Sequence, residues 1–311
     1  MTAFQISLFC TATAVMMSSA YASEGWMTDL PAALQRAKQE NKLVLVEFTG
    51  SDWCTACLAL KRNVLDKPEF REWAGEHFIF VEIDLPQSPD FPAEQRAQNE
   101  AIAEHYQVGG FPTILILNPL GNVIGGFHGN VRGIKEAVIP LEHALKADEL
   151  YHQAARLSGT ERARVLYQIY SNFPEGKGFD TPRRELRDTI IQADPENVTG
   201  IHHEAAVQEQ AQRFFREREA LPIMSPALGE LLERQLAEAL PENRPAVMLE
   251  RCQYAMCTAE TVDDITAVKR MFEEVIPLLP ATEAADIRHY VDTYFSNPAA
   301  LLQMLKASRP R

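Results

Sequence analysis

The chain is poor in cysteine and contains no block of basic residues. Only 5 of its 311 residues are cysteine, and its apolar content of 46% is enough to build hydrophobic cores without disulfide staples. The formal net charge is −13, and it is divided about equally between residues 23–146 and 147–311. Nucleic-acid binding depends on a patch or stripe of arginine and lysine, so the lack of a block of basic residues argues against nucleic acid as a partner.

The first 22 residues carry no charged side chain. An apolar stretch from Ile6 to Met17 precedes Ala20-Tyr21-Ala22, which is typical of a signal-peptide cleavage site. The stretch is short and diluted with polar residues, whereas a membrane-spanning helix needs about 20 mainly apolar residues. We therefore expect a cleaved signal peptide over residues 1–22 and a periplasmic or secreted bacterial protein. An uncleaved anchor is the alternative, because no lysine or arginine precedes the apolar stretch.

Residues 23–146 alternate between strand-like and helix-like segments. Short apolar runs rich in β-branched residues predict strands buried on both faces of a sheet, at 43–48, 78–83, 113–117 and 123–124. Amphipathic patterns predict helices at 30–39, 54–62, 68–76, 93–106 and 133–146. Gly125 and Gly126 indicate a bulge or a close backbone approach in the last strand. The alternation predicts an α/β domain with helices flanking a central sheet.

Strand-like patterns are lacking after residue 146. Helix starts are instead marked by N-cap residues with proline or glutamate one or two positions later, at Thr160, Ser225, Asn243, Thr282 and Asn297. We expect an all-α domain over residues 147–311, with eight or nine helices packed as antiparallel hairpins and no repeat period. The pattern does not assign this domain a role. Dimerisation, substrate selection and docking on a membrane-bound electron donor are all compatible with it.

Cys54 and Cys57 directly follow the strand predicted at 43–48. Their spacing places two thiols one turn apart at a helix N-terminus, where free N–H groups and the helix dipole favour the thiolate and lower the pKa of Cys54. The thiolate is the nucleophile of disulfide exchange, so we predict that Cys54 attacks and Cys57 resolves the mixed disulfide. A C-x-x-C pair in this context is a strong signal for redox catalysis, and we expect neither cofactor nor metal.

Two segments resemble the thioredoxin superfamily. Trp53-Cys54-Thr55-Ala56-Cys57 is similar to the family active-site motif, and Phe111-Pro112-Thr113 is similar to its cis-proline loop. The resemblance covers about residues 25–146, is closest to exported members of the Dsb type, and implies a thioredoxin-like fold with a mixed sheet. It also implies a cis bond before Pro112, whose neighbouring backbone pairs with an extended substrate segment. Glu47 lies where the family carries a buried acid that exchanges protons with the resolving cysteine, although the family has Asp, one residue closer to the cysteines.

Together these features predict an exported protein-disulfide oxidoreductase. Its expected partners are protein thiols and disulfides and a protein that donates or accepts electrons. Thr55-Ala56 lacks the histidine that, by the resemblance, makes oxidases and isomerases strongly oxidising, which favours a reductase. Two alternatives stay open: a disulfide oxidase or isomerase, and a non-catalytic binding module in which Cys54–Cys57 is a static disulfide.

Cys252 and Cys257 form a second close pair, and with Cys54 and Cys57 they would supply four zinc ligands. Their spacing puts the two side chains about 140° apart on a regular helix, which is a poor arrangement for one metal ion. We expect them to be small core residues, with a local disulfide as the alternative.

Three other side chains suit chemistry but are predicted to be structural. His202 and His203 point about 100° apart on a helix and are expected at the surface. Asp52 is expected to belong to the turn before the cysteines. His128 lies near the end of a predicted strand, where an approach to the active site is the less favoured interpretation.

Overall fold

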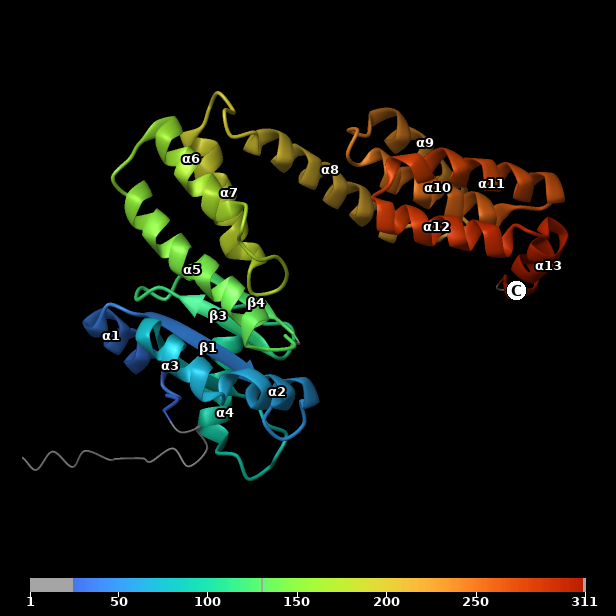
Figure 1. Ribbon diagram of the computed structural model, residues 1–311. Helices are drawn as coiled ribbons and strands as arrows, with labels where there is room; N and C mark the ends of the chain where they lie inside the picture. The colour runs from blue at the N-terminus through green and yellow to red at the C-terminus, as the bar shows by residue number, and fades with distance from the viewer. Residues whose placement is uncertain (1–24, 130, 310–311) are drawn as a thin grey trace, which may run out of the picture. The chain divides into compact units, whose positions relative to one another are not determined.

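The computed structural model describes residues 25–129 and 131–309, which form two compact units (Figure 1). The first unit ends at Thr199 and the second begins at Gly200. The predicted signal peptide over residues 1–22 lies outside the described residues. Within the described ranges, none of the helices combines the length and the apolar character that crossing a bilayer requires.

A four-stranded mixed sheet organises the first unit. Its strands are β1 (Leu43–Thr49), β2 (Phe78–Asp84), β3 (Thr113–Leu117) and β4 (Val123–His128), in the order β2-β1-β3-β4. The β1–β2 pair is parallel, whereas β1–β3 and β3–β4 are antiparallel. The two central strands β1 and β3 are buried along their whole length. The predicted strands and the mixed sheet are thereby confirmed.

Helices cover this sheet on both faces (Figure 1). They are α1 (Leu30–Glu40), α2 (Thr55–Leu60), α3 (Pro68–His77), α4 (Ala93–His105) and α5 (Ile134–Ala154), and a π-helical turn, η1 (Lys61–Leu65), continues α2. One core cluster joins α2, α3 and α5 to a single face of the sheet through residues such as Leu45, Leu60, Phe70, Ile116 and Leu141. Each such side chain contributes roughly 1.5–3 kcal/mol on burial, so this cluster holds α2 in place.

Helix α5 continues well past the end predicted for it. Its apolar stripe runs on through Ala147, Leu150 and Ala154, all buried, and neither glycine nor proline occurs between Pro140 and the end of the helix. The domain boundary predicted between residues 146 and 147 therefore falls inside a continuous helix. Helices α6 (Gly159–Tyr170) and α7 (Asp180–Ala193) follow as a hairpin that belongs to the first compact unit.

The second unit is entirely helical in its described residues. It consists of α8 (Ile201–Glu219), α9 (Pro226–Glu238), α10 (Arg244–Thr258), α11 (Val262–Val275), α12 (Ala281–Tyr294) and α13 (Pro298–Ser308), with a 3₁₀ turn, η2 (Ile276–Leu278). Ser225 and Asn297 are N-caps as predicted, and their side chains accept hydrogen bonds from the backbone of Leu228 and Ala300. Thr160 and Thr282 lie inside the first turns of α6 and α12 instead, because these helices begin earlier.

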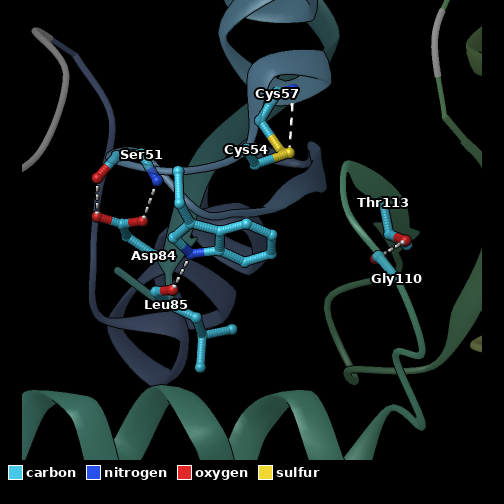
Figure 2. Close-up of a disulfide and its surroundings, with 8 residues drawn as sticks. Ser51, Cys54, Cys57, Asp84, Leu85, Gly110 and Thr113 are labelled. Carbon is cyan, nitrogen blue, oxygen red and sulfur yellow. Dashed lines mark hydrogen bonds between the residues drawn. A yellow bond between two sulfur atoms is a disulfide. The ribbon is translucent and has the colours of Figure 1, made fainter. Parts of the chain in front are cut away.

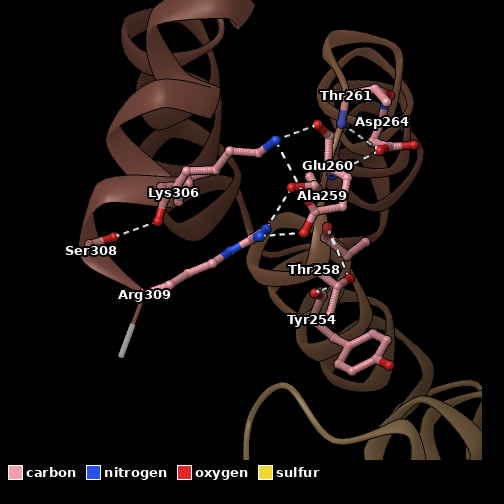
Figure 3. A network of polar contacts seen from close by, with 11 residues as sticks. Tyr254, Thr258, Ala259, Glu260, Thr261, Asp264, Lys306, Ser308 and Arg309 are labelled. Carbon is pink, nitrogen blue, oxygen red and sulfur yellow. Dashed lines mark hydrogen bonds and ion pairs between the residues drawn. The ribbon is translucent and has the colours of Figure 1, made fainter. Parts of the chain in front are cut away.

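The end of α13 is tied to the loop between α10 and α11 (Figure 3). Lys306 Nζ donates to the carbonyl oxygen of Glu260 at 2.7 Å, and the Arg309 guanidinium bonds the Glu260 carboxylate and the Ala259 carbonyl. In the same loop Thr261 and Asp264 form a capping box at the start of α11. These contacts connect the C-terminal helix of the second unit to a loop within the same unit.

Cys252 and Cys257 are both free thiols in α10. Cys252 is 1% exposed in the core of the second unit, and burial raises the pKa of its thiol to about 12. Burial also raises the pKa of Cys257. The core interpretation of Cys252 is confirmed, and the structure contains no local disulfide between the two.

Gly126 should be the most sensitive glycine of the sheet. Its φ is +136°, and a Cβ there would lie 2.1 Å from the Ile114 carbonyl oxygen on β3. We expect Gly126→Ala to lower the free energy of unfolding of the first unit by roughly 3 kcal/mol. Urea titration followed by tryptophan fluorescence measures this, because Trp26, Trp53 and Trp73 are the only tryptophans in the chain and all lie in this unit.

Gly75→Ala is the matched control, because a Cβ at that position of α3 meets nothing within 4 Å. In a helix this change should stabilise the unit by roughly 0.5–1 kcal/mol. Equal effects of the two substitutions would contradict the assignment of Gly126 to a close backbone approach.

Candidate active site

Cys54 and Cys57 form a disulfide at the start of α2, with sulfurs 2.08 Å apart (Figure 2). Cys54 is the N-cap of this helix, and its Sγ accepts a hydrogen bond from the Cys57 backbone N–H at 3.2 Å. Both residues are buried, Cys54 at 6% and Cys57 at 1% exposure. The predicted placement of two sulfurs at a helix N-terminus is confirmed. The Cys57 N–H that donates to Cys54 Sγ would equally stabilise a thiolate at that position.

Trp53 directly precedes Cys54 and is 41% exposed. Its indole N–H donates to the Leu85 carbonyl at 3.0 Å, and its ring stands edge-on to Phe111 with centroids 5.7 Å apart. A Cβ on Gly50 would lie 2.4 Å from the indole, so this glycine lets the ring lie against the turn. The structure thus brings Trp53 and Phe111 together from the two motifs that the sequence singled out.

The Phe111–Pro112 peptide bond is cis, as the family resemblance implied. Pro112 and Thr113 are buried, and Phe111 is half-buried. Thr113 Oγ1 donates to the Gly110 carbonyl at 2.8 Å, and the Gly129 N–H donates to the Pro112 carbonyl at 2.9 Å. Figure 2 shows the disulfide between the Gly110–Thr113 turn on one side and a Ser51–Asp84 contact on the other.

Glu47 is completely buried on β1, on the sheet face that α2 covers. Neither of its carboxylate oxygens has a hydrogen-bond partner among the described residues. It stands opposite Glu82 on β2, whose carboxylate pairs with Lys61 Nζ at 2.6 Å. Burial, reinforced by the negative charge of Glu82, raises the pKa of Glu47 to about 8. The carboxyl group is therefore mainly protonated at neutral pH.

Two carboxylates that were not predicted as site residues fix the turn before the cysteines. Asp84 accepts hydrogen bonds from the Ser51 N–H at 2.9 Å and from the Ser51 hydroxyl at 2.6 Å. Asp52 belongs to the turn as expected and accepts from the backbone of Gln87 at 2.9 Å and Ser88 at 2.7 Å. The Gln87 hydrogen bond holds the pKa of Asp52 below its usual value. These contacts join the active-site turn to the proline-rich segment after β2.

The three histidines singled out in the sequence, His128, His202 and His203, lie in different environments. His203 is exposed and pairs with Glu242 at 2.9 Å, whereas its neighbour His202 is half-buried. His128 Nδ1 lies 3.0 Å from Thr113 Oγ1, so the approach to the active site that the sequence disfavoured is present. The ranges that the structure covers contain no cluster of three or more His, Cys, Asp or Glu suited to a metal ion.

Comparison with known proteins decides the family. A family model described as thioredoxin-like matches residues 25–119. The chain is 35% identical over 114 residues to the disulfide bond reductase DsbH of Chlamydia pneumoniae. The matched residues cover 37% of this chain and 69% of that protein. This chain belongs to the thioredoxin-like family. Within it, the chain is a thiol–disulfide oxidoreductase of the Dsb type.

Two further similarities cover different shares of the chain. A solved DsbH oxidoreductase is 31% identical and matches 42% of this chain and 92% of its own, with a TM-score of 0.37. An uncharacterised protein of Treponema pallidum is 22% identical over 257 residues, covering 78% of this chain and 81% of that protein. The second similarity extends beyond the thioredoxin-like residues into the helical part.

Proposed function

We propose that this thioredoxin-like protein is an exported disulfide reductase that works through Cys54 and Cys57. The Cys54 thiolate attacks a substrate disulfide, forms a mixed disulfide and releases one substrate thiolate. The Cys57 thiolate then attacks Cys54, which releases the second substrate thiolate and leaves the Cys54–Cys57 disulfide. The substrate gains two electrons and the enzyme loses them. The observation that carries this proposal is the disulfide at the N-cap of α2, with the Cys57 N–H on Cys54 Sγ.

Glu47 is proposed to exchange protons with Cys57 during resolution. A carboxyl group whose pKa is raised to about 8 lies close to the range in which a cysteine thiol titrates, so a proton passes between the two groups at little cost. Glu47 lies on the sheet face that α2 covers, the helix that carries Cys57. An ordinary exposed glutamate, ionised far below neutral pH, would be a poor base for this step.

The substrate is proposed to bind over the exposed apolar side chains near the disulfide. Trp53 and Leu58 are large apolar side chains exposed at 41% and 48%, and Phe111 adds a third beside Trp53. An exposed apolar group of this kind suits contact with a partially unfolded or flexible protein segment. The backbone around Pro112 is the proposed edge along which the extended substrate segment pairs.

The reducing direction and the export of the protein rest on separate observations. The relative named above is a disulfide bond reductase, and Thr55-Ala56 lacks the histidine of the oxidising members. Export is inferred from the uncharged apolar segment and the Ala20-Tyr21-Ala22 pattern. We propose residues 23–146 as the redox domain and a thiol protein, soluble or membrane-bound, as its electron donor. The helical residues 147–311 are proposed to serve partner docking or dimerisation.

Turnover of two model substrates tests the direction. With a dithiol as electron source, the mature protein should accelerate the reduction of insulin disulfides. With glutathione disulfide as oxidant, it should not accelerate the oxidation of reduced ribonuclease. Cys252→Ala is the control, because that buried thiol lies in the second unit and should not affect either rate. Acceleration of oxidation alone would establish the oxidase alternative, and inactivity in both assays would favour the binding module.

A further inference from the structure

The loop between α6 and α7 packs against the segment that leads into the cis-proline. This loop, residues 171–179, is called the hairpin loop here. The aliphatic part of Lys177 lies over Gly109, where a Cβ would be 2.0 Å from Lys177 Cδ. Next to the loop, Thr181 Oγ1 donates to Gln107 Oε1 at 2.8 Å. Contacts between residues about 70 positions apart thus reach the segment immediately before Phe111 and Pro112.

A second set of contacts runs through His128 at the end of β4. The ring of His128 lies against Phe179, with centroids 4.8 Å apart, and a Cβ on Gly176 of the hairpin loop would lie 3.3 Å from its Nε2. On its other side His128 Nδ1 is 3.0 Å from Thr113 Oγ1, and the same hydroxyl donates to the Gly110 carbonyl at 2.8 Å. His128 therefore connects the hairpin loop to Thr113, whose hydroxyl closes the Gly110–Thr113 turn.

The hairpin loop is itself firmly held. Phe179 is completely buried, and Phe173 is 5% exposed. Arg183 Nη1 donates to the carbonyls of Tyr170 and Phe173 at 2.8 and 3.0 Å, which pins the start of the loop to α7. A rigid loop of this kind can restrain the segment that it contacts.

The restrained segment needs such support. Gly109 and Gly110 are adjacent, and glycine loses more conformational freedom on ordering than any other residue. A turn that is already ordered before the substrate arrives binds more tightly, because the substrate does not have to supply the ordering free energy. Contacts that order this turn from outside the thioredoxin-like residues would therefore raise the affinity for such a substrate.

We infer that the α6–α7 hairpin is part of the substrate-binding apparatus, and that His128 is the positioning residue through which it orders the Gly110–Thr113 turn for an extended protein segment. This inference rests on the proposed function. It assigns a role to the first helices after the thioredoxin-like residues. It also divides substrates into two classes, since small disulfides react at Cys54 without using the turn, whereas protein disulfides need it.

Kinetics with two disulfides test the inference in the full mature chain. For His128→Ala we expect the KM for insulin to rise about 3- to 10-fold, the range that loss of one hydrogen bond produces. The kcat, the rate constant for reaction of the reduced enzyme with 5,5′-dithiobis(2-nitrobenzoate), and the reduction potential of the cysteine pair should each stay within about twofold. His128→Asn, which keeps a side-chain nitrogen or oxygen near Thr113, should recover much of the lost affinity.

Two further variants complete the experiment. His152→Ala, at an exposed histidine on α5, is the control and should leave every parameter unchanged. Thr113→Val should raise the KM as His128→Ala does. The double variant should show less than the sum of the two effects, because both substitutions remove the same contact between His128 and Thr113. An unchanged KM in His128→Ala, or an equal fall in the rates with both disulfides, would overturn the inference. Failure of the wild-type chain to reduce either disulfide would instead overturn the proposed function.

Discussion

Cys54→Ser is expected to reduce disulfide turnover to the uncatalysed rate, whereas Cys57→Ser is expected to trap substrate proteins on Cys54. Serine at position 54 removes the nucleophile that forms the mixed disulfide. Serine at position 57 leaves that first step intact but removes the thiol that resolves it, so the mixed disulfide accumulates. Incubation of each reduced variant with native or scrambled disulfide-bonded protein substrates, followed by non-reducing electrophoresis, measures the outcome directly.

The asymmetry between the two cysteines comes from their positions in the fold. Cys54 is the N-cap of α2 and accepts the Cys57 N–H, whereas Cys57 lies inside the first turn and is 1% exposed. A substrate sulfur therefore reaches Cys54 first. Cys257→Ser should behave as the wild type in the same gel, since its thiol lies in the second unit. Adducts on Cys57→Ser that equal those on Cys54→Ser would contradict the assigned order of attack.

Glu47→Gln is expected to stabilise the first unit increasingly as the pH rises. The folded state holds the carboxyl proton more tightly than the unfolded state, since burial raises the pKa from an ordinary value of 4.5 to about 8. The stabilising effect of that proton is complete below the unfolded pKa and is lost as the pH rises through the folded one. Above pH 8 the wild type therefore carries a penalty on the order of 4 kcal/mol that glutamine lacks.

Urea titrations at several pH values measure this difference. The gap between Glu47→Gln and wild type should be close to zero near pH 4 and should approach its full size near pH 9, when tryptophan fluorescence reports the first unit. Glu76→Gln, at an exposed position of α3, should show no such pH-dependent gain. The same Glu47 variant should also slow resolution of the mixed disulfide. A gap that is flat with pH would show that the buried group does not titrate in this range.

The sheet and the cysteine pair could be predicted because their signals are local. The runs at 43–48 and 113–117 are apolar except for Glu47 and Thr113, as central strands buried on both faces favour, and the structure extends only the first by one residue. The end of α5 could not be predicted from the same kind of signal. Its apolar stripe continues past Lys146, and tertiary packing of α6 against it decides where the helix ends.

The support of the site was harder to predict because it is built from contacts distant in the sequence. Ser51 meets Asp84 across 33 positions, and Lys61 meets Glu82 across 21. His128 meets Phe179 across the α5–α6 segment. No spacing or periodicity along the chain marks such pairs, since they depend on which strands are neighbours and on where the hairpin folds back. The catalytic motif was predictable, whereas its surroundings were determined by topology.

The reduction potential of the Cys54–Cys57 couple tests the central claim most directly. Equilibration of the mature protein with defined thiol buffers gives this value. A reductase is expected near the potential of thioredoxin, about −270 mV, because its dithiol must lose electrons readily to substrates. A value near about −120 mV, that of the strong periplasmic oxidase, would contradict the reducing direction and identify a disulfide donor. A pair that forms no disulfide in any of the buffers would contradict the redox account itself.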